Sequence, residues 1–303
     1  MAGGVGAARL LAGLVQVVPP VDLIAIVNVG DDVELHGLHI SPDLDTVTYT
    51  VAGAIDPDRG WGLQGETWRA MEALGRYPST TTWFNLGDQD LATHLFRTDR
   101  LRSGAPLSTV TAEIAAAWHL GLRLLPATDD RLRTRVTIED GTEISFQEYF
   151  VQRQHAVSVT AVRFDGAEST QPAPGVLEAL AAAERVVIAP SNPLVSIAPV
   201  LAVPGVRAAV EARRADAIAV SPIIAGAALK GPADRLLREL GHESSVVGIA
   251  RLYAPLAATL VIDDADAEQA DAVEAAGMRC VVAPTIMRDA AAAAALGQVV
   301  VTA

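Results

Sequence analysis

Short apolar runs and segments of helical periodicity alternate along most of the chain. Residues 22–29 form a β-branched apolar run that predicts a buried strand, and helical spacing precedes it at residues 7–14. Further strands are expected at residues 157–164, 185–189, 217–220, 260–262 and 279–282. Helices are expected at residues 175–183, 205–214, 233–240, 267–276 and 288–296. This alternation predicts an α/β fold with a doubly wound, Rossmann-like, mostly parallel sheet.

The segment 56–121 has a different character. Strand patterns vanish there, and helical patterns follow one another at residues 66–76, 88–102 and 107–119. All four tryptophans lie in this segment, where we expect them to pack its helices. We interpret it as a helical insertion, so that residues 1–55 and 122–303 form the nucleotide-binding core. Residues 133–138 and 143–146 flank a glycine turn and predict a β-hairpin within that core.

Composition and charge narrow the classes of partner. The chain has 303 residues, is 50% hydrophobic and carries a net charge of −13. Such an acidic chain is a poor ligand for nucleic acid and is repelled by anionic membranes, because phosphate contacts need a positive field. No apolar run reaches the length of a membrane span, and the apolar residues 10–18 lack the flanks of a signal peptide. The single cysteine, Cys280, cannot form an internal disulfide, so we expect a cytoplasmic protein.

Glycines begin the chain just before its first predicted helix. Gly3, Gly4 and Gly6 allow backbone N–H groups to approach phosphate oxygens at a helix N-terminus. The third glycine of the dinucleotide fingerprint is missing, so the pattern is only weak support for NAD binding. A plain turn into a helix explains the same residues.

Acidic and polar residues follow two of the predicted strands. Asp31 and Asp32 come directly after the first strand, and Asp43 and Asp45 follow within fifteen residues, behind Ser41 as an expected helix N-cap. Carboxylates gathered at a sheet edge either bind a hard cation such as Mg²⁺ or form a solvated turn. The loop 191–193 follows a second strand, where it forms either an anion site or an ordinary turn.

The histidines carry weaker signals. His36 and His39 are spaced as a zinc pair would be, but no third ligand follows at metal spacing, so surface or substrate-facing roles are favoured. His94 fits a packed core histidine equally well.

At these segments the chain resembles the 2-phospho-L-lactate transferase family of deazaflavin coenzyme F-420 biosynthesis, including its actinobacterial phosphoenolpyruvate transferase branch. The most specific motifs are PDLDT at residues 42–46 and PSNP at residues 190–193. Other matching segments are residues 3–6, 27–32, 58–62, 66–67, 86–88, 90–94, 204–205 and 221–226.

The resemblance implies a Mg²⁺-dependent transfer. The donor would be a three-carbon acid, lactyl or enolpyruvyl, activated by guanosine diphosphate, and the acceptor the ribityl hydroxyl of 8-hydroxy-5-deazaflavin (Fo), with GMP leaving. Asp31, Asp32 and Asp45 would hold Mg²⁺, and Asp45 would also orient or deprotonate the hydroxyl. The donor phosphates would bind Gly3, Gly4, Gly6, Ser191, Asn192 and Pro193. The deazaflavin would bind Asp45, Asn85, Leu86, Gly87, Asp88, Leu91 and His94. A homodimer is expected from the family alone.

The chain departs from the family pattern in two places. Asn85 stands where other members often carry a basic side chain. Only Met1 and Ala2 precede the glycines, where the family has a hydrophobic strand, so we expect the true start to lie upstream.

Two other functions remain open from the sequence. A non-catalytic regulatory protein that binds nucleotide-sugars shares this sheet and glycine loop, but would lack the motifs of the insertion. A nicotinamide dehydrogenase rests on the glycines alone and lacks the acidic residue after the second strand.

Overall fold

The computed structural model describes residues 1–303 and is centred on parallel strands. Four of them pair in the order β13-β12-β9-β8. Their bounds are β8, Val186–Ile188, β9, Ala217–Val220, β12, Thr259–Ile262, and β13, Arg279–Val282. All these pairings are parallel, as the sequence predicted. Every residue of β9 and β12 is buried, which explains their unbroken apolar sequences.

A second parallel pair lies alongside the first. It consists of β1, Ile24–Val27, and β4, Arg123–Pro126. Residues 1 and 2 lie between the two groups of strands: Ala2 bridges in parallel to Val27, and the Ala189 N–H donates to the Met1 carbonyl at 3.1 Å. Met1 and Ala2 therefore join the two groups of strands.

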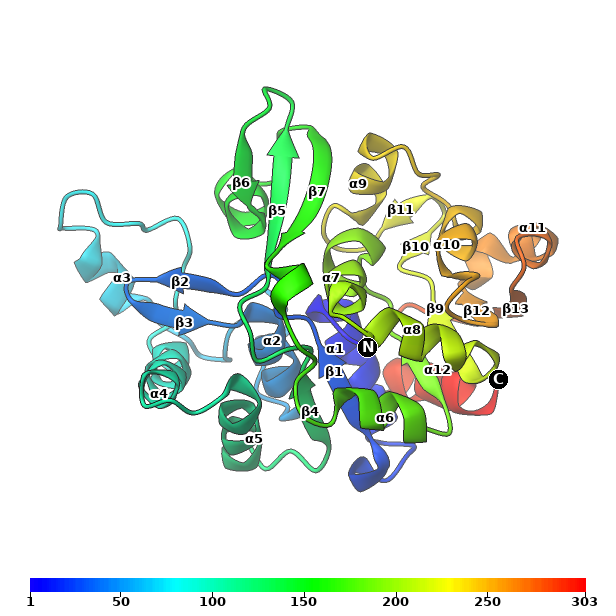
Figure 1. Ribbon diagram of the computed structural model, residues 1–303, viewed down its shortest axis with the longest axis horizontal. Helices are drawn as coiled ribbons and strands as arrows, with labels where there is room; N and C mark the ends of the chain where they lie inside the picture. Colours follow the sequence, from blue (N-terminus) through cyan, green and yellow to red (C-terminus); the bar gives the residue numbers. More distant parts are fainter.

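Two groups of helices cover these strands (Figure 1). In one group α1, Gly4–Leu14, packs against α12, Ala290–Thr302, and against α2, Pro42–Val51. In the other, α8, Val206–Ala212, packs against α6, Val176–Ala182, and α7, Ala198–Ala202. α9, Ala233–Glu239, α10, Val246–Tyr253, and α11, Ala270–Ala275, complete the C-terminal half. Helices on both faces of a parallel sheet confirm the doubly wound α/β fold.

The segment 56–121 is helical in the structure. Its helices are α3, Arg69–Leu74, α4, Asp90–Arg102, and α5, Leu107–Ala117. A two-stranded hairpin precedes it, with β2, Val33–Leu35, and β3, Leu38–Ile40, joined through His36 and Gly37, both at positive φ. This hairpin was not predicted from the sequence, because three-residue strands carry too little periodicity to be recognised.

A separate antiparallel sheet extends from the core (Figure 1). β5, Arg133–Ile138, and β6, Glu143–Ser145, form the predicted hairpin. β7, Val159–Asp165, pairs antiparallel with the other edge of β5, so its assignment to the parallel series was wrong. After the short helical segment Glu148–Gln152 the chain returns as β7 alongside β5, and β7 pairs with none of the central strands. The two-residue strands β10, Ile223–Ile224, and β11, Ala227–Ala228, form a further small hairpin.

No single helix has both the length and the apolar composition needed to cross a bilayer. Only the bent pair Pro193–Ala202 and Val206–Ala212 meets the test, when both helices are taken together across a 99° bend.

Candidate active site

The glycine turn and the loop after β8 lie directly against each other. The Ser191 hydroxyl donates to the Gly3 carbonyl at 2.8 Å. A Cβ on Gly6 would lie 2.2 Å from the carbonyl oxygen of Pro190, a distance that no side chain allows. Gly4 adopts a left-handed conformation with φ of 71°. The predicted meeting of these two segments is therefore present, and close backbone packing is one reason for glycine here.

Asp43 joins the glycine turn to the end of β1. Its Oδ1 accepts from the Gly4 N–H at 2.8 Å, and its Oδ2 accepts from the Asn28 amide at 2.9 Å. Asn28 in turn accepts from the Gly30 N–H at 2.8 Å. Burial raises the pKa of Asp43 to about 6, against the hydrogen bonds from Asn28 and Gly4, which lower it. Asp43 was predicted only as one of the carboxylates gathered at the sheet edge, with no separate role.

Several buried polar atoms at this edge of the sheet have no partner in the protein. Asn192 accepts from the Leu194 N–H at 2.9 Å through Oδ1, which leaves its Nδ2 donor unpaired. Asp31 and Asp32 each keep one buried oxygen, Oδ1, unpaired. Buried polar atoms are almost always satisfied in native proteins, so these three atoms indicate ligands. An amide donor fits an anion, and carboxylate oxygens fit a hard cation.

Asp32 is held from the far side of the same turn. Its Oδ2 accepts from the Ser41 hydroxyl at 2.8 Å and lies 2.9 Å from Nε2 of His39. Ser41 occupies the expected N-cap position of α2, but its hydroxyl makes no capping bond and serves Asp32 instead. These contacts fix one carboxylate oxygen of Asp32 and direct the free one away from them.

Asp31 is a poorly compensated carboxyl group. Burial raises its pKa well above the usual range, and the charge of Asp43 adds to the shift. The Gln147 amide donates to the backbone carbonyl of Asp31 at 3.2 Å, which holds the turn in place. A divalent cation would relieve the repulsion among these carboxylates, so the donor set fits Mg²⁺.

Asp45 makes its contacts with the helical insertion. It forms an ion pair with Arg97 of α4, whose Nη1 donates to Oδ2 at 3.1 Å, and both side chains are buried. Burial raises the pKa of Asp45, whereas the charges of Arg97 and His94 lower it. Of the two aspartates in the PDLDT motif, Asp43 meets the glycine turn and Asp45 meets α4.

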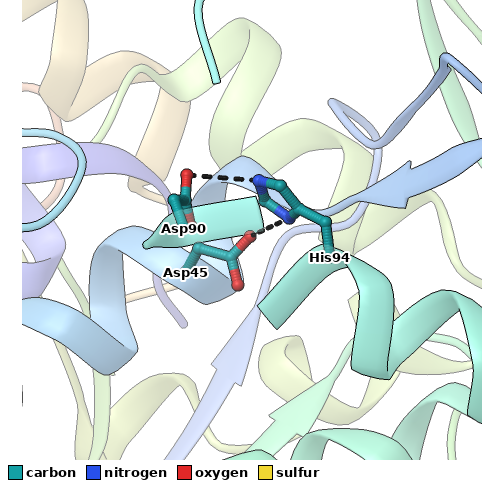
Figure 2. A group of neighbouring side chains, drawn as sticks. All are labelled: Asp45, Asp90 and His94. Carbon is teal, nitrogen blue, oxygen red and sulfur yellow. Dashed lines mark ion pairs between the residues drawn. The ribbon is translucent and has the colours of Figure 1, made fainter. Parts of the chain in front are cut away.

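His94 lies between two carboxylates (Figure 2). Its Nδ1 is 3.7 Å from Asp45 Oδ2, and its Nε2 is 3.1 Å from Asp90 Oδ2. These three side chains offer ligand atoms that all lie within 4.8 Å of one another, which is compatible with a divalent cation. The Tyr49 hydroxyl also donates to Asp90, at 2.5 Å.

The other residues predicted to contact the deazaflavin differ in burial and in the contacts that they make. Leu86 is buried in a small apolar cluster, and Leu91 packs against it. Gly87 adjoins Glu66, whose carboxylate accepts from the Gln89 N–H at 2.7 Å at the start of α4. Asp88 accepts from the Arg69 and Ala70 N–H groups at the start of α3. Asn85 is exposed, and its side chain makes no hydrogen bond.

The roles of Arg97 and Asn28 were not predicted from the sequence, because they depend on partners that are distant in the chain. Arg97 lies one helical turn after His94, so its placement on the same face of α4 was the available signal. Asn28 lies in the matching segment 27–32, which was the available signal, but its role was not predicted because one of its partners, Asp43, is brought to it by the fold.

The fold and this site define a doubly wound α/β protein with unpartnered polar groups at the carboxyl edge of its sheet whose chemistry suits an anion and a hard cation. Comparison with known proteins gives the family. The family model of 2-phospho-L-lactate transferase CofD matches residues 1–297, and the chain belongs to this family.

Curated relatives agree with that assignment. The phosphoenolpyruvate transferase of Streptomyces griseus is 45% identical and aligns over 98% of this chain and 95% of its own length. That of Mycolicibacterium smegmatis is 42% identical, over 98% of this chain and 95% of its own length. Two crystal structures of a UPF0052-family protein from Bacillus halodurans, BH3568, cover 99% of this chain and 97% of their own, with TM-scores of 0.63 and 0.64. At 16% and 18% identity they show the fold alone. The family and its curated members identify this chain as a transferase of coenzyme F-420 biosynthesis.

Proposed function

We propose that the protein transfers the phosphate-bearing three-carbon group of a guanosine-diphosphate-activated acid to the ribityl hydroxyl of Fo, releasing GMP. The observation that carries this proposal is the set of unpartnered buried atoms, Asn192 Nδ2 with Asp31 Oδ1 and Asp32 Oδ1, beside the glycine turn. A diphosphate with a bound cation needs both a donor and acceptors of this kind. The names of the relatives favour the enolpyruvyl donor over the lactyl one.

The donor phosphates bind at the glycine turn and the loop after β8. Gly4, where an added Cβ would meet no atom closer than 3.9 Å, keeps a side chain out of their path, while Gly3 and Gly6 let the turn pack closely against Ser196 and Pro190. Asn192 Nδ2 donates to a phosphate oxygen. Ser191 and Pro193 hold the loop in shape, since Ser191 is already bonded to Gly3. The Gly4 N–H is already donated to Asp43, so phosphate contacts come from the N–H groups that follow it.

Asp31 and Asp32 are the residues that hold Mg²⁺ in this proposal. When bound there, the ion neutralises charge that develops on the diphosphate during transfer. Asp45 stands apart from this pair in its contacts, because Arg97 already compensates its charge. We therefore assign its main role to the acceptor.

The acceptor binds between the core, residues 1–55 and 122–303, and the insertion, residues 56–121. Leu91 supplies apolar surface for the deazaflavin ring, next to Asn85, Gly87, Asp88 and His94, and the buried Leu86 supports it from within the apolar cluster. The ribityl hydroxyl oxygen attacks the phosphorus that carries the three-carbon acid, and the bond from that phosphorus to the GMP oxygen breaks. The hydroxyl proton passes to Asp45, whose pKa is raised by burial, while GMP leaves with the bridging oxygen.

The test is direct. The protein is incubated with Mg²⁺, Fo and either the enolpyruvyl or the lactyl donor, and the product mass is measured. We expect the enolpyruvyl product and GMP in equal amounts. Binding of guanine nucleotide without transfer from either donor would overturn the proposal in favour of a regulatory protein. From the family we also infer that the protein is cytoplasmic and forms a homodimer. Sedimentation of the purified protein would test the dimer.

A further inference from the structure

A recess adjoins the acidic turn, and none of the glycines at residues 3–6 lines it. It has a volume of about 240 Å³ and lies where the base of β5 meets the segment that leads into β2 (Figure 1). Its lining includes three acidic residues, Asp31, Asp32 and Glu34, and three arginines, Arg131, Arg133 and Arg135. Thr134, Ser145 and Gln147 add polar groups.

Two of these arginines have no acidic partner. Arg133 and Arg135 occupy alternate, half-buried positions on β5, so both project from the same face of the strand. Arg133 donates only to the carbonyl of Leu132, at 2.8 Å, and Arg135 makes no side-chain hydrogen bond or ion pair. The other exposed arginines of this small sheet are paired: Arg131 with Asp165 at 2.9 Å, and Arg163 with Glu143 at 2.6 Å.

The position of β5 is fixed relative to the acidic turn. The Thr134 N–H donates to the Gly30 carbonyl at 2.7 Å, and Gln147, just after β6 at the same end of the hairpin, donates to the Asp31 carbonyl. Burial lowers the pKa of Arg133, while the charges of Asp32 and Glu34 oppose that shift. A guanidinium in this position gains most from a ligand that is itself an anion.

We propose that Arg133 and Arg135 bind the carboxylate of the three-carbon acid in the donor, and so determine which donors the enzyme accepts. This inference rests on the proposed function. The diphosphate is already provided for by the glycine turn, Asn192 and the cation between Asp31 and Asp32. The remaining anionic group of the donor is its carboxylate, and the arginine face lies just beyond those aspartates. The planar fork of arginine matches a carboxylate through two parallel hydrogen bonds.

The proposal is tested by binding, without Fo or turnover. Isothermal titration calorimetry in the presence of Mg²⁺ compares phosphoenolpyruvate with ethyl phosphate, which carries the phosphate but no carboxylate. We expect the unmodified protein to bind phosphoenolpyruvate more tightly by about tenfold to a hundredfold, as one charge-assisted pair provides. Arg133→Gln and Arg135→Gln should each remove most of that preference and leave GDP affinity unchanged. Arg133→Lys, which keeps the charge but loses the fork, should restore only part of it.

Arg163→Gln is the matched control, because this arginine belongs to the same sheet but does not line the recess. It should bind both anions as the unmodified protein does. The proposal is overturned if the unmodified protein fails to bind phosphoenolpyruvate, fails to prefer it, or keeps its preference in both glutamine variants. If the glutamine variants lose the preference but the unmodified protein transfers no group to Fo, the arginine site is supported and the proposed function is overturned.

Discussion

The backbone N–H of Gly4 donates to the carboxylate of Asp43 at 2.8 Å, although the two residues lie 39 positions apart. This bond and the one from Asn28 tie the start of α1 to the start of α2 across the end of β1. The two segments that would face the donor are thereby held by a single side chain.

Replacement of Asp43 by asparagine should weaken this connection. One oxygen can still accept from Gly4, but the new amide faces the amide donor of Asn28. We expect Asp43→Asn to lower the free energy of unfolding at neutral pH by about 1–2 kcal/mol, measured by urea denaturation. Thr50→Val is a control on the same helix that leaves these contacts alone; an equal loss there would contradict the assigned role.

The raised pKa of Asp43 also predicts a pH dependence. The folded protein holds this proton up to about pH 6, whereas the unfolded chain releases it near pH 3.8. The unfolded state therefore binds fewer protons between these values, and the contribution of Asp43 to stability falls as pH rises from about 4 to about 6. Urea denaturation across this range should show that decline, and the decline should be smaller in Asp43→Asn.

Replacement of Asp31 should raise the stability of the protein but weaken its binding of cations. Its carboxylate is buried beside Asp43 and has one unpaired oxygen, so Asp31→Asn should raise the unfolding temperature in the absence of divalent cations. The same variant, and Asp32→Asn, should weaken cation binding at least tenfold, measured with Mn²⁺ by electron paramagnetic resonance. Asp99→Asn, an exposed change on α4, should alter neither quantity. Unchanged Mn²⁺ affinity in both variants would remove this pair from the metal site.

Variants of the neighbouring residues Asn192 and Ser191 should affect different properties, GDP affinity in the first case and stability in the second. Asn192→Asp keeps the oxygen that accepts from Leu194 but replaces the free donor with a carboxylate, so GDP affinity should fall at least tenfold with little change in unfolding. Ser191→Ala loses the bond to Gly3 and should instead lower the free energy of unfolding by about 1 kcal/mol. Fluorescence titration with GDP and urea denaturation distinguish the two. Unchanged GDP affinity in Asn192→Asp would mean that its amide faces no phosphate.

Asp45 needs a test that separates its chemistry from its ion pair. Asp45→Asn should abolish turnover, but it also leaves the buried Arg97 without a counter-charge, at a cost of about 3–5 kcal/mol. The double variant Asp45→Asn with Arg97→Met removes both charges and should recover most of that stability while remaining inactive. Product formation by the double variant, followed by mass, would exclude Asp45 as the acceptor of the hydroxyl proton.

The fold was predictable from sequence where elements carry a strong period. The strands β1, β8, β9 and β12 stand out because parallel strands covered on both faces are apolar at nearly every position, and the edge strand β13 still carries the short apolar run after Arg279. The hairpin of β2 and β3 was missed because it is too short to carry a period. The orientation of β7 was wrong because its apolar run shows that it is a strand but does not show which partner it meets.

The candidate site was predictable in its segments and less so in its side-chain partners. The glycines, the acidic turn and the loop at Ser191 could be placed together because ligand sites lie at the carboxyl ends of parallel strands. Which aspartate meets the glycine turn depends on the helical rotation between Asp43 and Asp45, which points them to different neighbours. The arginines of β5 are distant in sequence from the acidic turn, so only the folded chain places them beside it.

The packing of Gly6 against Pro190 bears on how substrate range could change in this family. At this contact the glycine turn meets main chain, so there is no side chain to shorten or enlarge. The recess beside the acidic turn is instead lined by arginine side chains, which single codon changes can alter. If those arginines bind the donor, new donors would be gained by substitutions along β5, while the glycine turn stays the same.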